Sequence, residues 1–486
     1  MRHHVPGSRA AAEVGTIVSE ELWRESALSL AELIRTGKVS SRDVVEAHLA
    51  RIEEVNPSLN AVVRVLADEA RAAADAADEK VAAGGPLGPL HGVPCTVKEN
   101  IDVAGTPTTG AVHALAEAIA PIDAPQVERL RAAGAIPIGR TNLPDLGLRV
   151  HTSSSLHGLT RNPWNPGRTA GGSSGGEAAA LASGMSPLGL GNDLGGSLRN
   201  PAHCCGIASI KPSVGAVPGA TTIPPEDMSL SFQMMAVEGV MARRVADVRA
   251  GFTAIAGRHA RDPLSVPAQF TDLAPGERLR VAVLPEPPGG STHPGIASAV
   301  RAAADALSDA GHDVLETAPP DYERVIDLWG RLLSVDIRVQ KTILDMVMGE
   351  DGRRFLDHAV NHLPEVDQTT LAMELTERYG ISRRWSLWHE DFPVLLCPVW
   401  TQPAFEHDFD IESYDNAVAT LELMRPVLPA NYLGTPAAVV PVGMADGLPV
   451  GVQVMGWRFT DLRCLAVAAQ IEERLGLTTP IDPVVA

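Results

Sequence analysis

Apolar residues near the start of the chain recur every three or four positions, which is the spacing of a buried helix face. One such stripe covers residues 28–34, and a second covers residues 44–52. Ser40 precedes the second stripe, and Asp43 lies three positions after Ser40. This is the arrangement of a helix N-cap. Because a proline disfavours helical backbone in the residue before it, we predict that the second helix ends at Asn56-Pro57.

Farther along the chain the pattern changes to short apolar runs separated by helical segments. Such runs are typical of buried strands. They lie at residues 60–65, 93–97, 135–138, 187–190, 280–284 and 312–317, and again within 429–457. Helices are expected between and after them, at about 126–133, 293–307 and 461–475. This alternation predicts an α/β fold, with a mixed or parallel sheet and helices on both faces.

Composition narrows the class of protein. The 486 residues include 40 basic and 59 acidic side chains, which gives a formal net charge of −19. That balance argues against a nucleic-acid binder and against an anionic membrane surface, because both need a clustered basic face. Five cysteines without CxxC or zinc-ligand spacing suit a reducing compartment and no structural metal. With no signal-peptide pattern and no apolar run near the ~18–20 residues of a membrane span, we expect a cytoplasmic protein.

The densest chemical signal begins with Gly-Gly-Ser-Ser-Gly-Gly at residues 171–176. Local composition alone would fit a flexible linker, but a helix-forming run at 177–183 follows at once. The first five residues also match G-x-S-x-G, the nucleophile elbow of α/β-hydrolases, with Ser173 as the nucleophile. That template needs an acidic residue and then a histidine downstream. Histidine candidates without a recognisable setting are His358, His362, His389 and His407.

A second Gly-Ser cluster lies twenty-four residues beyond Ser173, around Ser197. Residues 191–199 are Gly-Asn-Asp-Leu-Gly-Gly-Ser-Leu-Arg, preceded by a predicted strand. Two glycines permit a tight turn, which presents consecutive backbone N–H groups to one point. Such a turn is suited to stabilising an oxyanion beside a serine hydroxyl.

A serine nucleophile needs a proton acceptor, and the lysine count points to a candidate. Only five of the 40 basic residues are lysines, yet Lys98 directly follows the apolar run at 93–97. One interpretation is a lysine that snorkels at a strand end or pairs with Glu99. The other is a base whose pKa is lowered by desolvation from ~10.4 towards neutrality. The residues alone leave both open.

Taken together, these segments resemble the amidase signature family. The order and spacing of four motifs carry the resemblance: Val-Lys-Glu-Asn-Ile at 97–101, the cluster at 171–176, Asp-Leu-Gly-Gly-Ser-Leu-Arg at 193–199, and Ile-Lys-Pro at 210–212. The resemblance implies a large α/β domain around a central, twisted mixed sheet. We therefore expect a single catalytic domain over 25–480 after an N-terminal extension over 1–24. Within it lie a signature core at about 90–215 and a variable substrate-pocket region at about 274–402.

The resemblance also implies roles for individual residues. Lys98 would be the base, Ser173 a bridging serine on a cis peptide, and Ser197 the nucleophile of an acyl-enzyme mechanism. Backbone N–H groups would bind the oxyanion, and the residues that supply them are Leu194, Gly195 and Gly196. The supporting residues are Ser174 as a hydrogen-bond partner, and Asp193 with Arg199 as an ion pair that braces the turn. No metal or cofactor is expected.

The implied reaction is hydrolysis of a carboxamide-type C–N bond in an amide, anilide or carbamate (urethane). The Trp-bearing segment 320–400 suits an apolar or aromatic small molecule, and we keep a homodimer as a candidate assembly. Two alternatives remain open: the catalytic subunit of a tRNA-dependent amidotransferase, which shares the signature, and an α/β-hydrolase-type esterase that uses Ser173.

Several positions depart from the family pattern or remain to be interpreted. Asn192 and Leu194 stand where threonine is common, so an unusual pocket wall is expected. We interpret His203 as a satisfied core histidine and Cys204 as a buried thiol. The methionines in 228–241 either line an adaptable pocket or belong to the core, and the core is the interpretation we favour.

Overall fold

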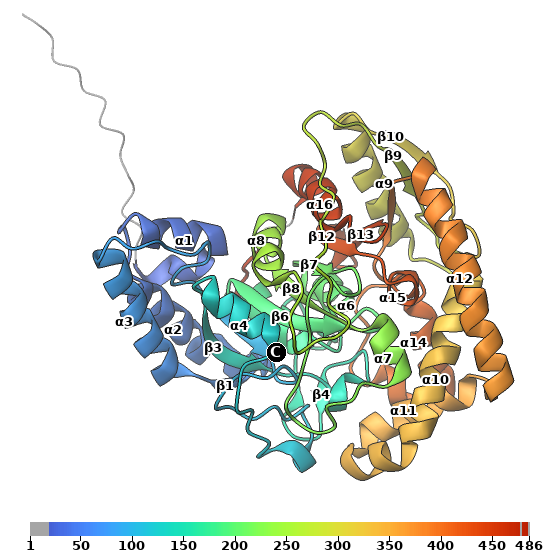
Figure 1. Ribbon diagram of the computed structural model, residues 1–486, viewed down its shortest axis with the longest axis horizontal. Helices are drawn as coiled ribbons and strands as arrows, with labels where there is room; N and C mark the ends of the chain where they lie inside the picture. The colour runs from blue at the N-terminus through green and yellow to red at the C-terminus, as the bar shows by residue number, and fades with distance from the viewer. Residues whose placement is uncertain (1–18, 477–478, 485–486) are drawn as a thin grey trace, which may run out of the picture.

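An eleven-stranded mixed sheet runs through the computed structural model, which describes residues 19–476 and 479–484 (Figure 1). Its strands, in spatial order, are β1 (Val62–Val65), β3 (Ile136–Thr141), β2 (Pro94–Lys98), β6 (Leu188–Asp193), β8 (Val237–Ala242), β7 (Ala208–Lys211), β12 (Ala437–Ala445), β13 (Leu448–Gly456), β11 (Val394–Pro398), β9 (Arg280–Val283) and β10 (Asp313–Glu316). Strands β3, β2 and β6 are parallel, as are β11, β9 and β10, and the remaining neighbours are antiparallel. The predicted α/β class with a mixed sheet is confirmed.

Both faces of this sheet are buried against helices. Along β12, Ala438 and Val440 join one apolar cluster, whereas Ala437 and Val439 join the other. The first cluster is completed by α1 (Ala27–Arg35), α4 (Pro125–Ala132), α8 (Val245–Ile255), α9 (Pro294–Asp309) and α16 (Asp461–Leu475). The second is completed by α2 (Ser41–Leu59), α3 (Ala67–Ala82), α5 (Gly175–Ala182), α6 (Arg199–Cys205), α10 (Tyr322–Val347), α12 (Gln368–Asp391) and α15 (Leu428–Leu433). Consecutive strand residues point to opposite faces, so a run that is apolar throughout requires cover on both sides.

The remaining α-helices are α7 (Leu230–Met235), α11 (Glu350–His362), α13 (Phe409–Glu412) and α14 (Tyr414–Leu423). Of these, α7 adds Met235 to the second cluster. A third apolar cluster joins α10 to α11 and includes Ile337, Phe355 and Val360. None of the helices that the structure describes has both the length and the apolar character of a bilayer span. Of the predicted N-terminal extension, residues 1–18 lie outside the described residues.

Helix α2 begins as predicted but ends later. The Ser40 side chain accepts from the backbone N–H of Asp43, whose carboxylate accepts from the N–H of Ser40. The predicted end at Asn56-Pro57 is wrong, because the helix continues to Leu59. The Asn56 carbonyl accepts from Asn60 N–H, and its side-chain amide bonds to the backbone beyond the helix, so the last turn is held although Pro57 lacks a donor.

The segment 429–457 also differs in part from its expected strand character. It opens with the short helix α15, which has Pro429 in its first turn and ends at Gly434 with φ of 70°. Strands β12 and β13 then form a hairpin whose turn includes Gly447, with φ of 76°. Proline near a helix start and a left-handed glycine at its end are the usual boundaries of a helix.

Candidate active site

The three serine- and lysine-bearing motifs meet at one edge of the sheet. Lys98 is the last residue of β2, and the turn that carries Ser197 directly follows β6. These strands are parallel neighbours, with Val97 opposite Leu190. Because parallel strands end at the same edge, the carboxyl ends of β2 and β6 bring the two motifs together.

The amine of Lys98 is completely buried and held by two oxygen acceptors. Its Nζ lies 2.8 Å from Oγ of Ser173 and 2.7 Å from Oδ1 of Asn192. The contact with Asn192 was not predicted from the sequence. The sequence did mark this position, because Asn192 stands where threonine is common. It did not indicate that Asn192 would bond to Lys98.

Burial lowers the pKa of Lys98 to about 7, because the charged ammonium is removed from water. The carboxylates of Glu238, Asp193 and Glu177 oppose this shift by stabilising the cation. A substantial fraction of the amine is therefore neutral at physiological pH. Of the two interpretations left open by the sequence, the structure favours the desolvated lysine over one that snorkels to solvent.

The first Gly-Ser cluster forms the loop before α5. The peptide between Gly172 and Ser173 is cis. A Cβ at Gly172 would lie 2.5 Å from the carbonyl carbon of Val150, so only glycine fits. The N–H of Ser174 donates to the carbonyl oxygen of Ser197 at 3.2 Å, which ties the two serine-bearing loops together.

The hydroxyl contacts of these loops differ from two expectations. The Ser174 hydroxyl is buried and has no hydrogen-bond partner among the described residues. Its backbone, rather than its side chain, makes the supporting contact. Within the described part of the chain, Ser173 Oγ bonds to Lys98, and no hydrogen bond joins it to the hydroxyl of Ser197.

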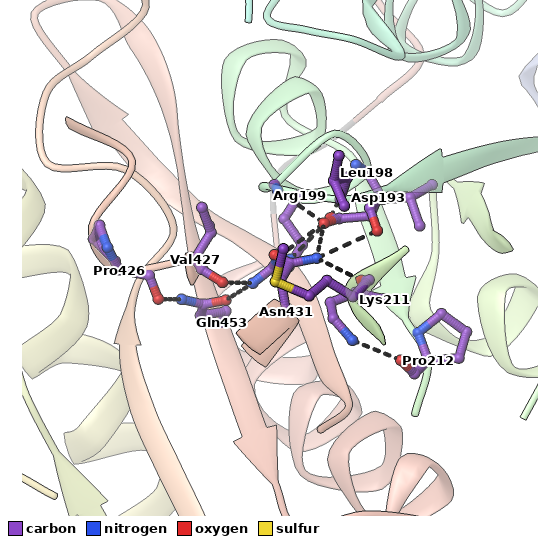
Figure 2. A network of polar contacts seen from close by, with 12 residues as sticks. Asp193, Leu198, Arg199, Lys211, Pro212, Pro426, Val427, Asn431 and Gln453 are labelled. Carbon is purple, nitrogen blue, oxygen red and sulfur yellow. Dashed lines mark hydrogen bonds and ion pairs between the residues drawn. The ribbon is translucent and has the colours of Figure 1, made fainter. Parts of the chain in front are cut away.

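The second Gly-Ser cluster is braced by a buried ion pair (Figure 2). Arg199 donates from Nε to Oδ2 of Asp193 and from Nη2 to Oδ1, each at 3.0 Å, and both side chains are fully buried. The predicted ion pair is confirmed. Burial disfavours the ionised carboxyl, but Arg199 outweighs this effect and holds the pKa of Asp193 well below its usual range.

Contacts from the C-terminal part of the chain complete this network. Arg199 also donates to Oδ1 of Asn431 at 2.6 Å and to Oε1 of Gln453 at 3.0 Å (Figure 2). Gln453 donates to the carbonyl oxygen of Pro426 at 2.7 Å. Neither amide residue was among the predicted site residues.

Asp193 also engages the backbone of the turn itself. Its Oδ1 accepts from Gly196 N–H at 2.8 Å, and its Oδ2 accepts from Leu198 N–H at 3.1 Å. The donor of Gly196 is therefore already in use, contrary to its expected place among the oxyanion donors. The N–H groups of Leu194 and Gly195 are left as candidates.

Ser197 lies in the wall of a narrow apolar pocket of about 70 Å³. Helices α10 and α11, within the region 274–402 that was expected to vary with substrate, supply part of the lining, and residues 147–150 and the nucleophile turn supply another part. The indole of Trp329 forms part of the wall and donates from Nε1 to the carbonyl oxygen of Leu194 at 3.0 Å. The surface beside the nucleophile is therefore mostly apolar.

The other residues singled out in the sequence are structural. Nδ1 of buried His203 accepts from Gly451 N–H at 3.1 Å, which leaves Nε2 to donate to the Gln402 carbonyl at 3.3 Å. Cys204 is a buried free thiol. Met235 and Met241 belong to the core and Met234 packs against it, whereas Met228 is exposed, so the core interpretation is wrong for that residue. No three His, Cys, Asp or Glu side chains in the described ranges are arranged to hold a metal ion.

Comparison with known proteins agrees with this architecture. The family model described as Amidase matches residues 43–465, and the chain belongs to this family. It is similar to an indoleacetamide hydrolase of Bradyrhizobium diazoefficiens, with 40% identity over 94% of this chain and 87% of that protein. It is also similar to a glutamyl-tRNA(Gln) amidotransferase subunit of Salinispora arenicola, with 34% identity over 95% of this chain and 99% of that protein.

A solved structure extends the comparison to three dimensions. The 6-aminohexanoate cyclic dimer hydrolase, complexed with substrate, superposes with a TM-score of 0.82 and 30% identity, covering 94% of this chain and 98% of that one. The chain is thus an amidase that hydrolyses amide C–N bonds.

The α/β-hydrolase interpretation of Ser173 is not supported. Its hydroxyl bonds to Lys98, and the four candidate histidines make no hydrogen bond to it within the residues described. Three of them bond elsewhere: His362 to the Tyr414 hydroxyl, His389 to the Phe392 carbonyl, and His407 to the Pro166 carbonyl.

Proposed function

We propose that this amidase hydrolyses small carboxamides that carry an apolar or aromatic group next to the scissile carbonyl, through an acyl-enzyme on Ser197. One observation carries the proposal. The hydroxyl of Ser173 lies 2.8 Å from a buried amine whose pKa is about 7, and Ser197, in the neighbouring loop, faces an apolar pocket. A base that is neutral at working pH is what activation of a serine requires.

The chemistry follows from these contacts. Neutral Lys98 accepts the proton of Ser173, and Ser173 accepts the proton of Ser197. Oγ of Ser197 then attacks the carbonyl carbon, and the C–N bond breaks as the nitrogen receives the proton back through Ser173. Water attacks the resulting ester by the same relay and releases the acid and Ser197.

The oxyanion of each tetrahedral intermediate would be held by the backbone of the turn after β6. Leu194 and Gly195 supply the donors, since the N–H of Gly196 is bonded to Asp193. The Asp193–Arg199 pair keeps this turn rigid, so the donors need little reorganisation during the reaction.

The pocket and the relatives support an aromatic acyl group. The wall beside Ser197 includes Leu194, Trp329 and Phe355, which offer apolar surface and few polar partners. An indoleacetamide hydrolase shares 40% identity with this chain over nearly its whole length. We therefore place arylacetamides first among the candidate substrates, ahead of anilides and aryl carbamates.

Amidotransferase activity is the second candidate, because of the 34% identity with one component of such an enzyme. An apolar pocket beside the nucleophile suits glutamine poorly. Ammonia release from glutamine, and partner chains copurifying with the protein, would favour this alternative.

Turnover of a substrate panel tests the proposal. The panel contains indole-3-acetamide, an anilide, an aryl carbamate, an aryl ester and glutamine. We expect indole-3-acetamide to have the highest kcat/KM, and Ser197→Ala to abolish its turnover. If Ser197→Ala turned over indole-3-acetamide at the wild-type rate, the assignment of Ser197 as the nucleophile would be refuted. A preference for glutamine would refute the proposed substrate class.

A further inference from the structure

Near Lys98 lies a half-buried carboxylate that the proposed mechanism does not use. Glu238 on β8 is the direct cross-strand partner of Asn192 on β6. Directly opposed residues in an antiparallel pair have Cβ atoms about 4.5–5.5 Å apart, on the same face of the sheet. Since Asn192 accepts from Lys98 Nζ at 2.7 Å, the three side chains form a row across neighbouring strands.

Among the residues that the structure describes, no ion pair joins a cation to Glu238. Its Oε2 is buried and has no hydrogen-bond partner in the part of the chain that the structure describes. Burial raises the pKa of Glu238 to about 7, whereas the charge of Lys98 and the nearby side-chain amides of Asn192 and Gln126 lower it. Asp262 lines the same small cavity as Glu238, and its negative charge also raises the pKa of Glu238.

The chemistry of an amide explains what such a row does. A primary amide accepts through its oxygen and donates through its NH₂ group, whereas an ionised carboxylate only accepts. When Glu238 is ionised, it would favour the orientation in which the NH₂ end of Asn192 faces it, which leaves Oδ1 for the amine of Lys98. The reverse orientation would place donor against donor at Lys98 and acceptor against acceptor at Glu238.

Orientation of this amide affects the base directly. A neutral lysine amine has two N–H donors and one lone pair. When Asn192 accepts one N–H, the amine has fewer ways to turn, and the lone pair can be directed at the hydroxyl of Ser173, its other neighbour.

We propose that Glu238 is a positioning residue for Lys98, which acts through Asn192 to orient the amine and contributes the negative charge that balances its protonated form. The inference rests on the proposed function, because it takes Lys98 to be the base.

The other charged groups near Lys98 are already committed to closer partners. They are Asp193 on β6, which pairs with Arg199, and Glu177 on α5, which accepts from the hydroxyls of Thr96 and Thr141. Of the three carboxylates that stabilise the lysine cation, Glu238 has the largest effect. Loss of its charge therefore lowers the pKa of Lys98, so the amine becomes neutral at a lower pH.

The test is the rate at which a fluorophosphonate probe labels Ser197, followed from weakly acid to weakly alkaline pH. Labelling requires activation of the nucleophile but no knowledge of the substrate. We expect Glu238→Gln to move the acid limb to lower pH by ~1 unit and to slow labelling on the plateau. Glu238→Asp retains the negative charge on a shorter side chain. The pH midpoint of labelling should therefore stay at the wild-type value, while the labelling rate on the plateau falls.

Variants at the neighbouring positions complete the experiment. Asn192→Leu should slow labelling at least about tenfold, and Asn192→Thr, which restores an oxygen acceptor, should recover part of the rate. The matched control is Glu472→Gln on α16, which neutralises another partly buried carboxyl whose pKa is raised by burial, away from both Lys98 and Glu238, and should keep the wild-type profile. Thermal unfolding of each variant reports folding separately.

The failure of this inference is distinct from failure of the proposed function. A folded Glu238→Gln with the wild-type midpoint would overturn the positioning role, while Ser197→Ala and Lys98→Met still abolish labelling. Wild-type labelling in Lys98→Met would instead overturn the base on which the inference rests.

Discussion

The indole N–H of Trp329 donates to the carbonyl oxygen of Leu194 at 3.0 Å, and this bond fixes a pocket helix to the turn that carries the nucleophile. Leu194 also supplies one of the two proposed oxyanion donors. Substrate selection and transition-state stabilisation therefore share a single peptide segment. A change in the pocket wall on α10 is transmitted to the turn through this bond and through apolar contact.

Trp329→Phe should therefore affect both binding and chemistry. The variant removes the hydrogen bond and part of the aromatic wall, so we expect KM for indole-3-acetamide to rise several-fold and kcat to fall by a similar factor. A lost neutral hydrogen bond of ~1 kcal/mol corresponds to about fivefold. The measurement is steady-state kinetics. Trp388→Phe, on α12 and outside the pocket lining, is the control and should leave both constants unchanged.

The pH dependence of turnover should follow the amine of Lys98. Only its neutral form accepts a proton, and burial places its pKa at about 7. We therefore expect kcat/KM to rise with pH through a midpoint near 7 and to fall on the acid side as the amine is protonated. Initial rates in overlapping buffers give the profile. A midpoint near 10, the value of an exposed lysine, would contradict the assignment.

Breaking the Asp193–Arg199 pair should be costly to stability. Arg199→Met leaves a carboxylate buried without its cation, which destabilises by roughly 3–5 kcal/mol. The double variant Asp193→Asn with Arg199→Met should lose less than the sum of the single variants, because no unpaired charge remains. Urea unfolding measures each free energy. Arg301→Met, which breaks only exposed ion pairs with Glu286 and Glu316, should change it by less than ~0.5–1 kcal/mol.

Gly172→Ala should abolish activity. The added Cβ would lie 2.5 Å from the carbonyl carbon of Val150, and its other near neighbours are also backbone atoms of Val150 and His151, so the loop that carries Ser173 must move. Labelling by a fluorophosphonate and thermal unfolding report the outcome. Gly380→Ala in the middle of α12 is the contrasting substitution. Its Cβ meets only the end of the flexible Arg384 side chain, so we expect a gain of up to ~1 kcal/mol.

Much of the local structure could be predicted because it depends on neighbouring residues. The Ser40–Asp43 cap and most strands of the sheet follow from patterns a few residues long. The end of α2 was missed because it depends on Asn56, whose amide bonds to backbone that only approaches after the chain turns. The α15 helix within 429–433 was missed because short apolar runs suit either a buried helix or a strand.

By itself, the sequence determined which residues are candidates for the chemistry. The motifs around Lys98, Ser173 and Ser197 are local patterns of residue type and spacing, so they can be recognised from the sequence without knowledge of the fold. The tertiary structure alone decided how the candidates are used. The burial that lowers the Lys98 pKa, the cross-strand pairing of Asn192 with Glu238, and the bond from Trp329 to the nucleophile turn all join segments far apart in the chain. Desolvation and hydrogen-bond geometry depend on what surrounds a side chain in space, so no spacing along the sequence could specify them.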